Sequence, residues 1–136
     1  MLLVRHASAG DRGEWEHDDR ARPLDEKGKL QADHLVGLLE PYRVDRILSS
    51  PAVRCVATVE PLARARGLAI EVGEELAEEQ QSSAGAELVR SLRGTDALVC
   101  GHGGLEDATL AEAPRWKKGA VLVLDDDLGV VETLRP

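Results

Sequence analysis

Apolar and polar positions form blocks of two kinds along this chain. Short runs that are almost wholly apolar predict strands, because a strand buried on both faces shows little alternation. Longer stretches with apolar residues three and four positions apart predict helices that bury one face. The predicted strands are residues 1–5, 44–50, 68–73, 96–101, 119–127 and 130–135. The predicted helices are the stretch between Asp25 and Pro41 and residues 50–67, 83–93 and 105–112.

The helix predicted over residues 50–67 carries the clearest boundary signals. We expect Ser50 to cap this helix and Pro51 to occupy its first position, where a missing N–H costs little. Pro61 is expected to kink or restart the helix, and Gly67 to end it. Its expected buried stripe is Val53, Val56, Val59 and Ala63.

Strands that alternate with helices predict an α/β fold. We expect a three-layer α/β/α sandwich with a mainly parallel sheet and helices on both faces. The last two strands, joined around Leu128 and Gly129, predict a hairpin that adds an antiparallel edge. A chain of 136 residues without repeats or a linker predicts a single domain over residues 1–136. The polar segment 7–23 is a long loop, and loops of this length are often functional.

Composition narrows the choice of partners. A net charge of −8 and an aromatic content of 2% argue against a nucleic-acid polymer or an anionic membrane as partner. Cys55 and Cys100 lie far apart without a CxxC motif, so they predict buried apolar residues rather than a zinc site or disulfide. His17, Asp18 and Asp19 predict a hydrated loop rather than a metal site, and we expect no cofactor. Without a signal peptide or a bilayer-length apolar run, the expected location is cytoplasmic.

Candidate chemistry gathers at the predicted strand ends. Ligands of open α/β sheets bind outside the carboxyl ends of the strands. Arg5 and His6 follow the first strand, and Arg54 lies in the first turn of the helix after the second. His102 follows the fourth strand within the sequence GHGG. Fold stability does not require two histidines and two arginines at one edge of a sheet.

An anion at this edge explains these residues better than packing does. A cation such as Arg54 interacts unfavourably with the helix dipole in the first turn of a helix. A bound anion makes the electrostatic interaction favourable. The glycines around His102, Gly103 among them, allow close backbone approach and expose N–H groups that suit an anion. Taken singly, Arg54 could face solvent and His102 could be an incidental turn residue.

The combination suits phosphoryl transfer. A phosphate needs cationic and N–H groups around its equatorial oxygens, and two arginines and one histidine supply them without a metal. The other histidine can then be the nucleophile. Nearby arginines lower the pKa of that imidazole and keep it neutral. The expected intermediate is a covalent phosphohistidine that water hydrolyses.

Three motifs in this order resemble the histidine phosphatase superfamily, in its phosphoglycerate mutase-like branch. They read LVRHA, SSPAVRCVAT and VCGHGG, and they span essentially the whole chain. The resemblance implies a three-layer α/β/α fold, with His6 as the phosphorylated nucleophile. It also implies that Arg5, Arg54 and His102 form the phosphate pocket. The family's usual motif has glycine after the histidine, where this chain has Ala7.

Two narrower resemblances compete within the family. The segment RARPLDEKG is similar to the small bacterial phosphohistidine phosphatases of the SixA type. The segments HDDRARPLDEKG, VRCVATVEPLA and LAEEQ are similar to the C-terminal phosphatase domain of mycobacterial MutT-type Nudix proteins. The second resemblance implies oxidised guanine nucleotides or dinucleoside polyphosphates as substrates, and a Nudix domain as a partner.

The general acid is the least defined part of the site. Glu78 and Glu79 are the nearest candidates, although a solvated acidic turn explains either of them equally well. Arg22 could be a further phosphate ligand or a surface residue that stabilises its turn. A phosphoanhydride or phosphoramidate has a good leaving group and depends little on an acid, so the substrates we expect are nucleotides or phosphohistidine proteins. The alternatives are a phosphate-binding regulatory module without turnover and, last, a sugar-acid mutase.

Overall fold

The computed structural model describes residues 1–136 and contains a single six-stranded sheet in the order β3-β2-β4-β1-β5-β6. The strands are β1 Leu2–Arg5, β2 Arg46–Ser49, β3 Ile70–Val72, β4 Ala97–Gly101, β5 Val121–Leu124 and β6 Val130–Leu134. The first four pair in parallel, and the β5–β6 hairpin adds an antiparallel edge beside β1. The predicted α/β fold is confirmed.

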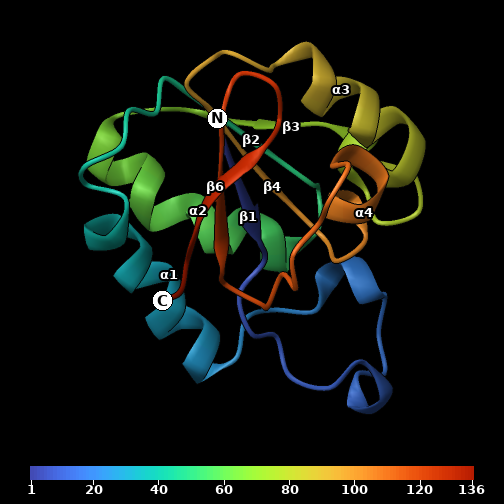
Figure 1. Ribbon diagram of the computed structural model, residues 1–136. Helices are drawn as coiled ribbons and strands as arrows, with labels where there is room; N and C mark the ends of the chain where they lie inside the picture. Colours follow the sequence, from blue (N-terminus) through green and yellow to red (C-terminus); the bar gives the residue numbers. More distant parts are fainter.

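Helices cover both faces of the sheet, which makes the three layers (Figure 1). The helices are α1 Glu26–Leu38, α2 Val53–Arg66, α3 Ala86–Ser91 and α4 Leu105–Thr109. In Figure 1, α1 and α2 lie on the left of the sheet and α3 and α4 on the right. Shorter turns are η1 Arg12–Glu14, η2 Asp19–Ala21, η3 Glu74–Leu76 and the one-turn π-helix η4 Gln81–Gly85. None of these helices combines the length and the apolar character that crossing a membrane requires.

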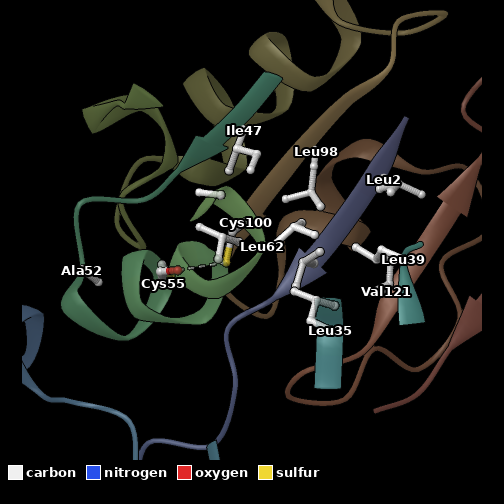
Figure 2. Close-up of a cluster of buried hydrophobic side chains, with 13 residues drawn as sticks. Leu2, Leu35, Leu39, Ile47, Ala52, Cys55, Leu62, Leu98, Cys100 and Val121 are labelled. Carbon is white, nitrogen blue, oxygen red and sulfur yellow. Dashed lines mark hydrogen bonds between the residues drawn. The ribbon is translucent and has the colours of Figure 1, made fainter. Parts of the chain in front are cut away.

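Each face of the sheet has its own apolar core. Successive side chains of a strand point to opposite faces, so Leu98 of β4 packs among the side chains of α1 and α2 while Val99 packs towards α3 and α4. Figure 2 shows the first cluster, with Leu35 of α1 and Leu62 of α2 facing the strands. Both faces are buried, which explains why the central strands read as continuous apolar runs.

The strand order determines where the functional segments meet. β4 lies between β1 and β2, with Arg5 opposite Gly101 and Ser49 opposite Cys100. The three parallel strands therefore end side by side. The segments that follow them, which contain His6, Ser50 and His102, start from one edge of the sheet.

The structure corrects two details of α2. The helix begins at Val53 with Ala52 as its cap residue, not at Ser50 and Pro51. The helix does not restart at Pro61, which lies inside it between Val59 and Leu62, both fully buried against the core. Packing of this kind compensates for the hydrogen bond that proline cannot donate.

The buried face of α2 also differs from the predicted stripe. Val53 is 44% exposed, whereas Arg54 is 1% exposed. The face that packs inward is Arg54, Cys55, Thr58, Val59, Leu62 and Ala63. The apolar pattern predicts a face that is rotated by about one residue from the observed one. A pattern of apolar residues cannot show that an arginine side chain is buried.

The other boundaries are close to those predicted. The Asp25 carboxylate caps α1 by accepting from the Gly28 N–H at 2.8 Å. Gly67 ends α2 in the left-handed conformation with φ of 65°. The loop over residues 7–23 is folded by η1 and η2 and lies beyond the carboxyl end of β1, at the bottom of Figure 1.

Candidate active site

His6 leaves β1 with its imidazole already oriented. Its backbone N–H donates to the Gly101 carbonyl at 3.1 Å, and its Nδ1 lies 2.8 Å from the Ala7 carbonyl. A carbonyl only accepts, so Nδ1 carries the proton and Nε2 keeps its lone pair. The Thr58 hydroxyl of α2 accepts from the Ala7 N–H at 2.9 Å and fixes this turn. The tautomer is the one that a nucleophilic Nε2 requires.

The environment of His6 favours the neutral ring. Burial, together with the charges of Arg54, His102 and Arg5, lowers the pKa of His6 from 6.5 to about 3, against the opposing effect of the hydrogen bond to Ala7. The side chain is only 5% exposed. The imidazole is therefore unprotonated at neutral pH, as the sequence reasoning expected from the nearby arginines.

Arg54 of α2 lies beside His102, with almost its whole side chain buried. Its Nη1 donates to the Asp19 carbonyl at 2.8 Å and its Nη2 to the Asp19 carboxylate at 2.9 Å. Its Nε is buried without any hydrogen-bond partner. Leaving a guanidinium N–H unpaired in the interior is costly, so this atom indicates an anion-binding role.

The His102 ring packs edge to face against the His6 ring, with centroids 5.5 Å apart and an angle of 63° between the rings. Nη2 of Arg54 lies 3.4 Å from its Nδ1, and the Ser50 hydroxyl lies 2.8 Å from its Nε2. A guanidinium only donates, so Nδ1 accepts and the proton lies on Nε2. The side-chain amide of Gln81 fixes the His102 backbone through two hydrogen bonds of 3.0 and 3.1 Å.

Arg5 completes the set from the end of β1. Its Nη1 donates to the Trp116 carbonyl at 2.8 Å, and its Nε is the second buried guanidinium nitrogen without a partner. A Cβ at Gly103 would lie 3.0 Å from Cζ of Arg5. Glycine at this position therefore lets the guanidinium approach the backbone. The Gly103 N–H makes no hydrogen bond within the chain, which leaves it available to a ligand.

A cavity of about 440 Å³ opens in front of His6, and we call it the site cavity. It is lined by Arg5, His6, Gly10, Asp11, Arg12, Arg22, Glu78, Gly103 and Lys118. Four of these side chains are cationic and two are acidic, in a chain where acidic residues outnumber basic ones. The lining is wholly without hydrophobic residues, which suits a small, highly charged ligand.

Of the two candidate acids, the structure brings Glu78 to the cavity. Its carboxylate accepts from Nη2 of Arg12 at 2.8 and 3.1 Å, and one oxygen lies 3.5 Å from Nη2 of Arg54. Glu79 instead pairs with Arg20, away from the cavity lining. A carboxylate that accepts from two arginines has no proton to donate in this arrangement.

Arg22 is buried in the wall of the site cavity, and most of its donors serve the loop. Its Nη1 donates to the Ala9 carbonyl at 2.6 Å and its Nε to the Asp19 carboxylate at 3.1 Å. These contacts support one of the two roles that the sequence left open, in which Arg22 stabilises its loop. The phosphate-binding role stays a prediction.

Asp19, Ser50 and Gln81 hold the site together, and sequence reasoning assigned none of them this role. Asp19 bridges Arg54, Arg22 and Arg12. The position of Ser50 at a strand end could have indicated a role in the site, but the sequence pattern predicted it as a helix cap. Gln81 gives no signal in the sequence, since it lies in a polar stretch far from His102.

Groups that could hold a metal are absent from the structure. No three His, Cys, Asp or Glu side chains converge on one point, at His17 and its neighbours or elsewhere. Cys55 and Cys100 are free and buried beside the sheet, where Sγ of Cys100 donates weakly to the Cys55 carbonyl (Figure 2).

A mainly parallel sheet whose strand ends gather two histidines and two arginines beside a polar cavity defines a phosphohydrolase class of protein. Comparison with known families gives the assignment. The chain belongs to the histidine phosphatase superfamily (branch 1), whose family model matches residues 1–82.

Known relatives agree with this assignment. The chain is 44% identical over 64 residues to an 8-oxo-(d)GTP phosphatase of Mycolicibacterium smegmatis; the match covers 47% of this chain and 20% of that protein. The chain thus spans about a fifth of the length of this relative.

Solved structures share the fold over nearly the whole chain. A phosphohistidine phosphatase SixA from Agrobacterium tumefaciens is 27% identical, with a TM-score of 0.83 over 99% of this chain and 97% of that one. A SixA protein histidine phosphatase complexed with tungstate is 22% identical, with a TM-score of 0.76 over 98% and 95% of the two chains.

Proposed function

We propose that this chain is a metal-independent phosphatase that forms a phosphohistidine on His6 and acts on a phosphoanhydride or a phosphoramidate. The observation that carries the proposal is the His6 tautomer. Nδ1 is committed to the Ala7 carbonyl, and the side chain lines the site cavity beside the unpartnered Nε of Arg5.

In the first step, Nε2 of His6 attacks the phosphorus and the bond to the leaving oxygen breaks. The electron pair goes to that oxygen, and the phosphoryl group stays on His6. Arg5 and Arg54 balance the charge on the equatorial oxygens, which persists through the transition state. In the second step, water attacks the phosphohistidine, releases phosphate and returns Nε2 with its lone pair.

Phosphate reaches Arg54 by exchange with an anion already present. The Asp19 carboxylate occupies Nη2 of Arg54 at 2.9 Å, and Glu78 lies at 3.5 Å. Both carboxylates reach solvent, with side chains 36% and 39% exposed, so each can be hydrated when phosphate displaces it. The buried guanidinium therefore keeps a counter-ion in the free protein and gains a stronger one on binding.

The leaving group follows from the state of Glu78. Because Glu78 accepts from Arg12, the site favours substrates whose leaving oxygen or nitrogen needs little protonation. Nucleotide phosphoanhydrides and protein phosphohistidine both meet this condition. The relatives named for 8-oxo-(d)GTP and for phosphohistidine support the same two classes.

A trapping experiment tests the proposal. The protein is incubated with a labelled aryl phosphate in EDTA, denatured with base to preserve phosphoramidates, and the labelled residue is mapped. We expect turnover with label on His6 and its loss in His6→Ala, with His34→Ala as the control, because His34 is an exposed helix residue.

Two outcomes would contradict the proposal. Label on another residue would remove His6 as the nucleophile. Phosphate binding without turnover on aryl phosphate, nucleoside diphosphate and phosphohistidine peptide would favour a regulatory phosphate-binding module instead.

A further inference from the structure

A second cavity adjoins the site cavity and has an unusual charge. It measures about 470 Å³, within the range of small-ligand pockets, and we call it the basic groove. Six cationic side chains line it and no acidic one does. They are Arg5, Lys27, Arg115, Lys117, Lys118 and Arg135. The chain has 17 Lys and Arg against 25 Asp and Glu, so an all-cationic lining of this size is not a reflection of composition.

The cations of the basic groove make no direct ion pair, although the charge of Lys118 helps to lower the pKa of the Asp25 carboxyl. None of the six makes an ion pair, whereas six of the eleven other Lys and Arg residues do, namely Arg12, Arg20, Arg22, Lys29, Arg46 and Arg54. Lys27 lies in the first turn of α1, where the helix dipole opposes a cation. The repulsion among these side chains is relieved when an anion binds between them.

The groove is built directly onto the catalytic strand. The Gly119 N–H donates to the Arg5 and His6 carbonyls, and the Arg5 N–H donates to the Ala120 carbonyl, all at 3.1 Å. Trp116, buried in the core, anchors the other end of this segment. Figure 1 shows the end of the chain after β6 beside α1, which brings the remaining cations to the same place. The segment that carries Lys117 and Lys118 is therefore fixed relative to His6.

Arg5 and Lys118 line both cavities, so the basic groove continues the site cavity. A phosphoryl group beside His6 would have its leaving group between these two cations. A second phosphate attached to the first through a bridging oxygen would then point into the groove.

We propose that the basic groove binds the second phosphate of an organic diphosphate or polyphosphate, and that this chain prefers such substrates to monophosphates and to phosphohistidine proteins. The inference rests on the proposed function. In the transfer step, Nε2 of His6 bonds to the terminal phosphorus, and the P–O bond to the bridging oxygen breaks. The leaving phosphate keeps the electron pair as a stable anion and needs no proton from Glu78. A small concave cavity fits a phosphate chain better than the broad surface of a protein.

The test uses two substrates and matched double variants. Lys27→Ala/Lys117→Ala removes two charges from the basic groove without touching the site cavity. The control, Arg43→Ala/Arg93→Ala, removes two exposed charges elsewhere. kcat/KM is measured for ADP and for para-nitrophenyl phosphate. We expect the groove variant to lose about tenfold or more on ADP, the effect of one or two charge-assisted bonds, and less than about twofold on the aryl phosphate, where no such bond is lost. The control should change neither.

Inorganic pyrophosphate tests the groove without any contribution from the nucleobase of ADP. It should inhibit aryl phosphate hydrolysis more strongly than inorganic phosphate does, and the groove variant should remove most of this difference. Lys27→Arg/Lys117→Arg should restore it, because the charge returns.

The remaining outcomes separate the two proposals. Equal losses on both substrates, or no loss on ADP, would overturn the groove while leaving the His6 mechanism intact. A loss seen only with an acidic phosphohistidine protein would replace the diphosphate with a protein partner. Absence of any His6-dependent turnover in the wild type would instead overturn the proposed function.

Discussion

At the scale of single residues, the site depends on which groups form hydrogen bonds with each imidazole ring. His6 donates a hydrogen bond from Nδ1 to the Ala7 carbonyl, and His102 is hydrogen-bonded to Ser50 and Arg54. One ring nitrogen of His6 is thus hydrogen-bonded within the protein, whereas both ring nitrogens of His102 are. The sequence predicted the identities of these residues from their places after strands, but their tautomers depend on neighbours that only folding supplies.

The pH dependence of catalysis follows from the His6 environment. Only the neutral ring attacks, and its pKa of about 3 lies far below 6.5. We expect kcat/KM to stay level from pH 8 down to pH 5, because His6 remains unprotonated in the free protein over this range. The phosphoester substrate also loses its second proton at about pH 6. Its titration is measured separately, and the kcat/KM values are corrected for it.

The control for this prediction is His17→Gln, which changes a histidine outside the site cavity and should leave the profile unaltered. The profile for kcat should fall at a higher pH than that for kcat/KM, since bound phosphate favours the protonated ring. An acid limb of kcat/KM centred near 6.5 would show that burial does not govern this ring.

At the scale of elements, the sequence predicted the strands and the hairpin edge but not the order of the four parallel strands. Apolar runs predicted the six strands and their layers, because burial on both faces leaves a clear pattern. The face of α2 was misjudged, since Arg54 and Thr58 are polar residues that turn inward. The contacts of Gln81 and Asp19 could not be predicted, because they join segments far apart in sequence and carry no periodic signal.

Two glycines of α1 provide a matched test of packing. A Cβ at Gly28 would lie 1.9 Å from the Ser8 carbonyl oxygen, whereas nothing lies within 4 Å of a Cβ at Gly37. We expect Gly28→Ala to destabilise the protein by about 1–3 kcal/mol or more, because backbone must move. Gly37→Ala should stabilise it by about 0.4–1 kcal/mol through helix propensity.

Urea unfolding of both variants gives these free energies directly. The comparison also bears on the site, since Ser8 follows the His6 turn. Gly28→Ala should therefore lower kcat on aryl phosphate while Gly37→Ala leaves it unchanged. Equal stabilities of the two variants would mean that α1 does not pack against the Ser8 backbone as described.

At the scale of the whole molecule, His6 makes stability depend on pH. The unfolded chain protonates this histidine below 6.5, but the folded chain does so only near 3. The unfolded state therefore binds more protons between these values, and stability falls as pH decreases through this window. The contribution of this one group approaches about 1.4 kcal/mol per pH unit.

The variant His6→Asn isolates this effect, because its side chain does not titrate and can still donate to the Ala7 carbonyl. Urea unfolding at pH 7 and pH 5 should show a smaller loss of stability for the variant than for the wild type. Identical losses in the two proteins would place the pH dependence elsewhere.

The position of β1 in the sheet has a consequence for how the chain acquires its structure. Both strands that pair with β1 follow it late in the sequence, β4 at residues 97–101 and β5 at residues 121–124. During synthesis, the apolar strand that precedes His6 has no partner until most of the chain has been made. Such long-range pairing slows folding and leaves an open strand edge exposed to aggregation. The nucleophile thus precedes most of the sheet along the chain but reaches its working position only after β4 and β5 have paired with β1.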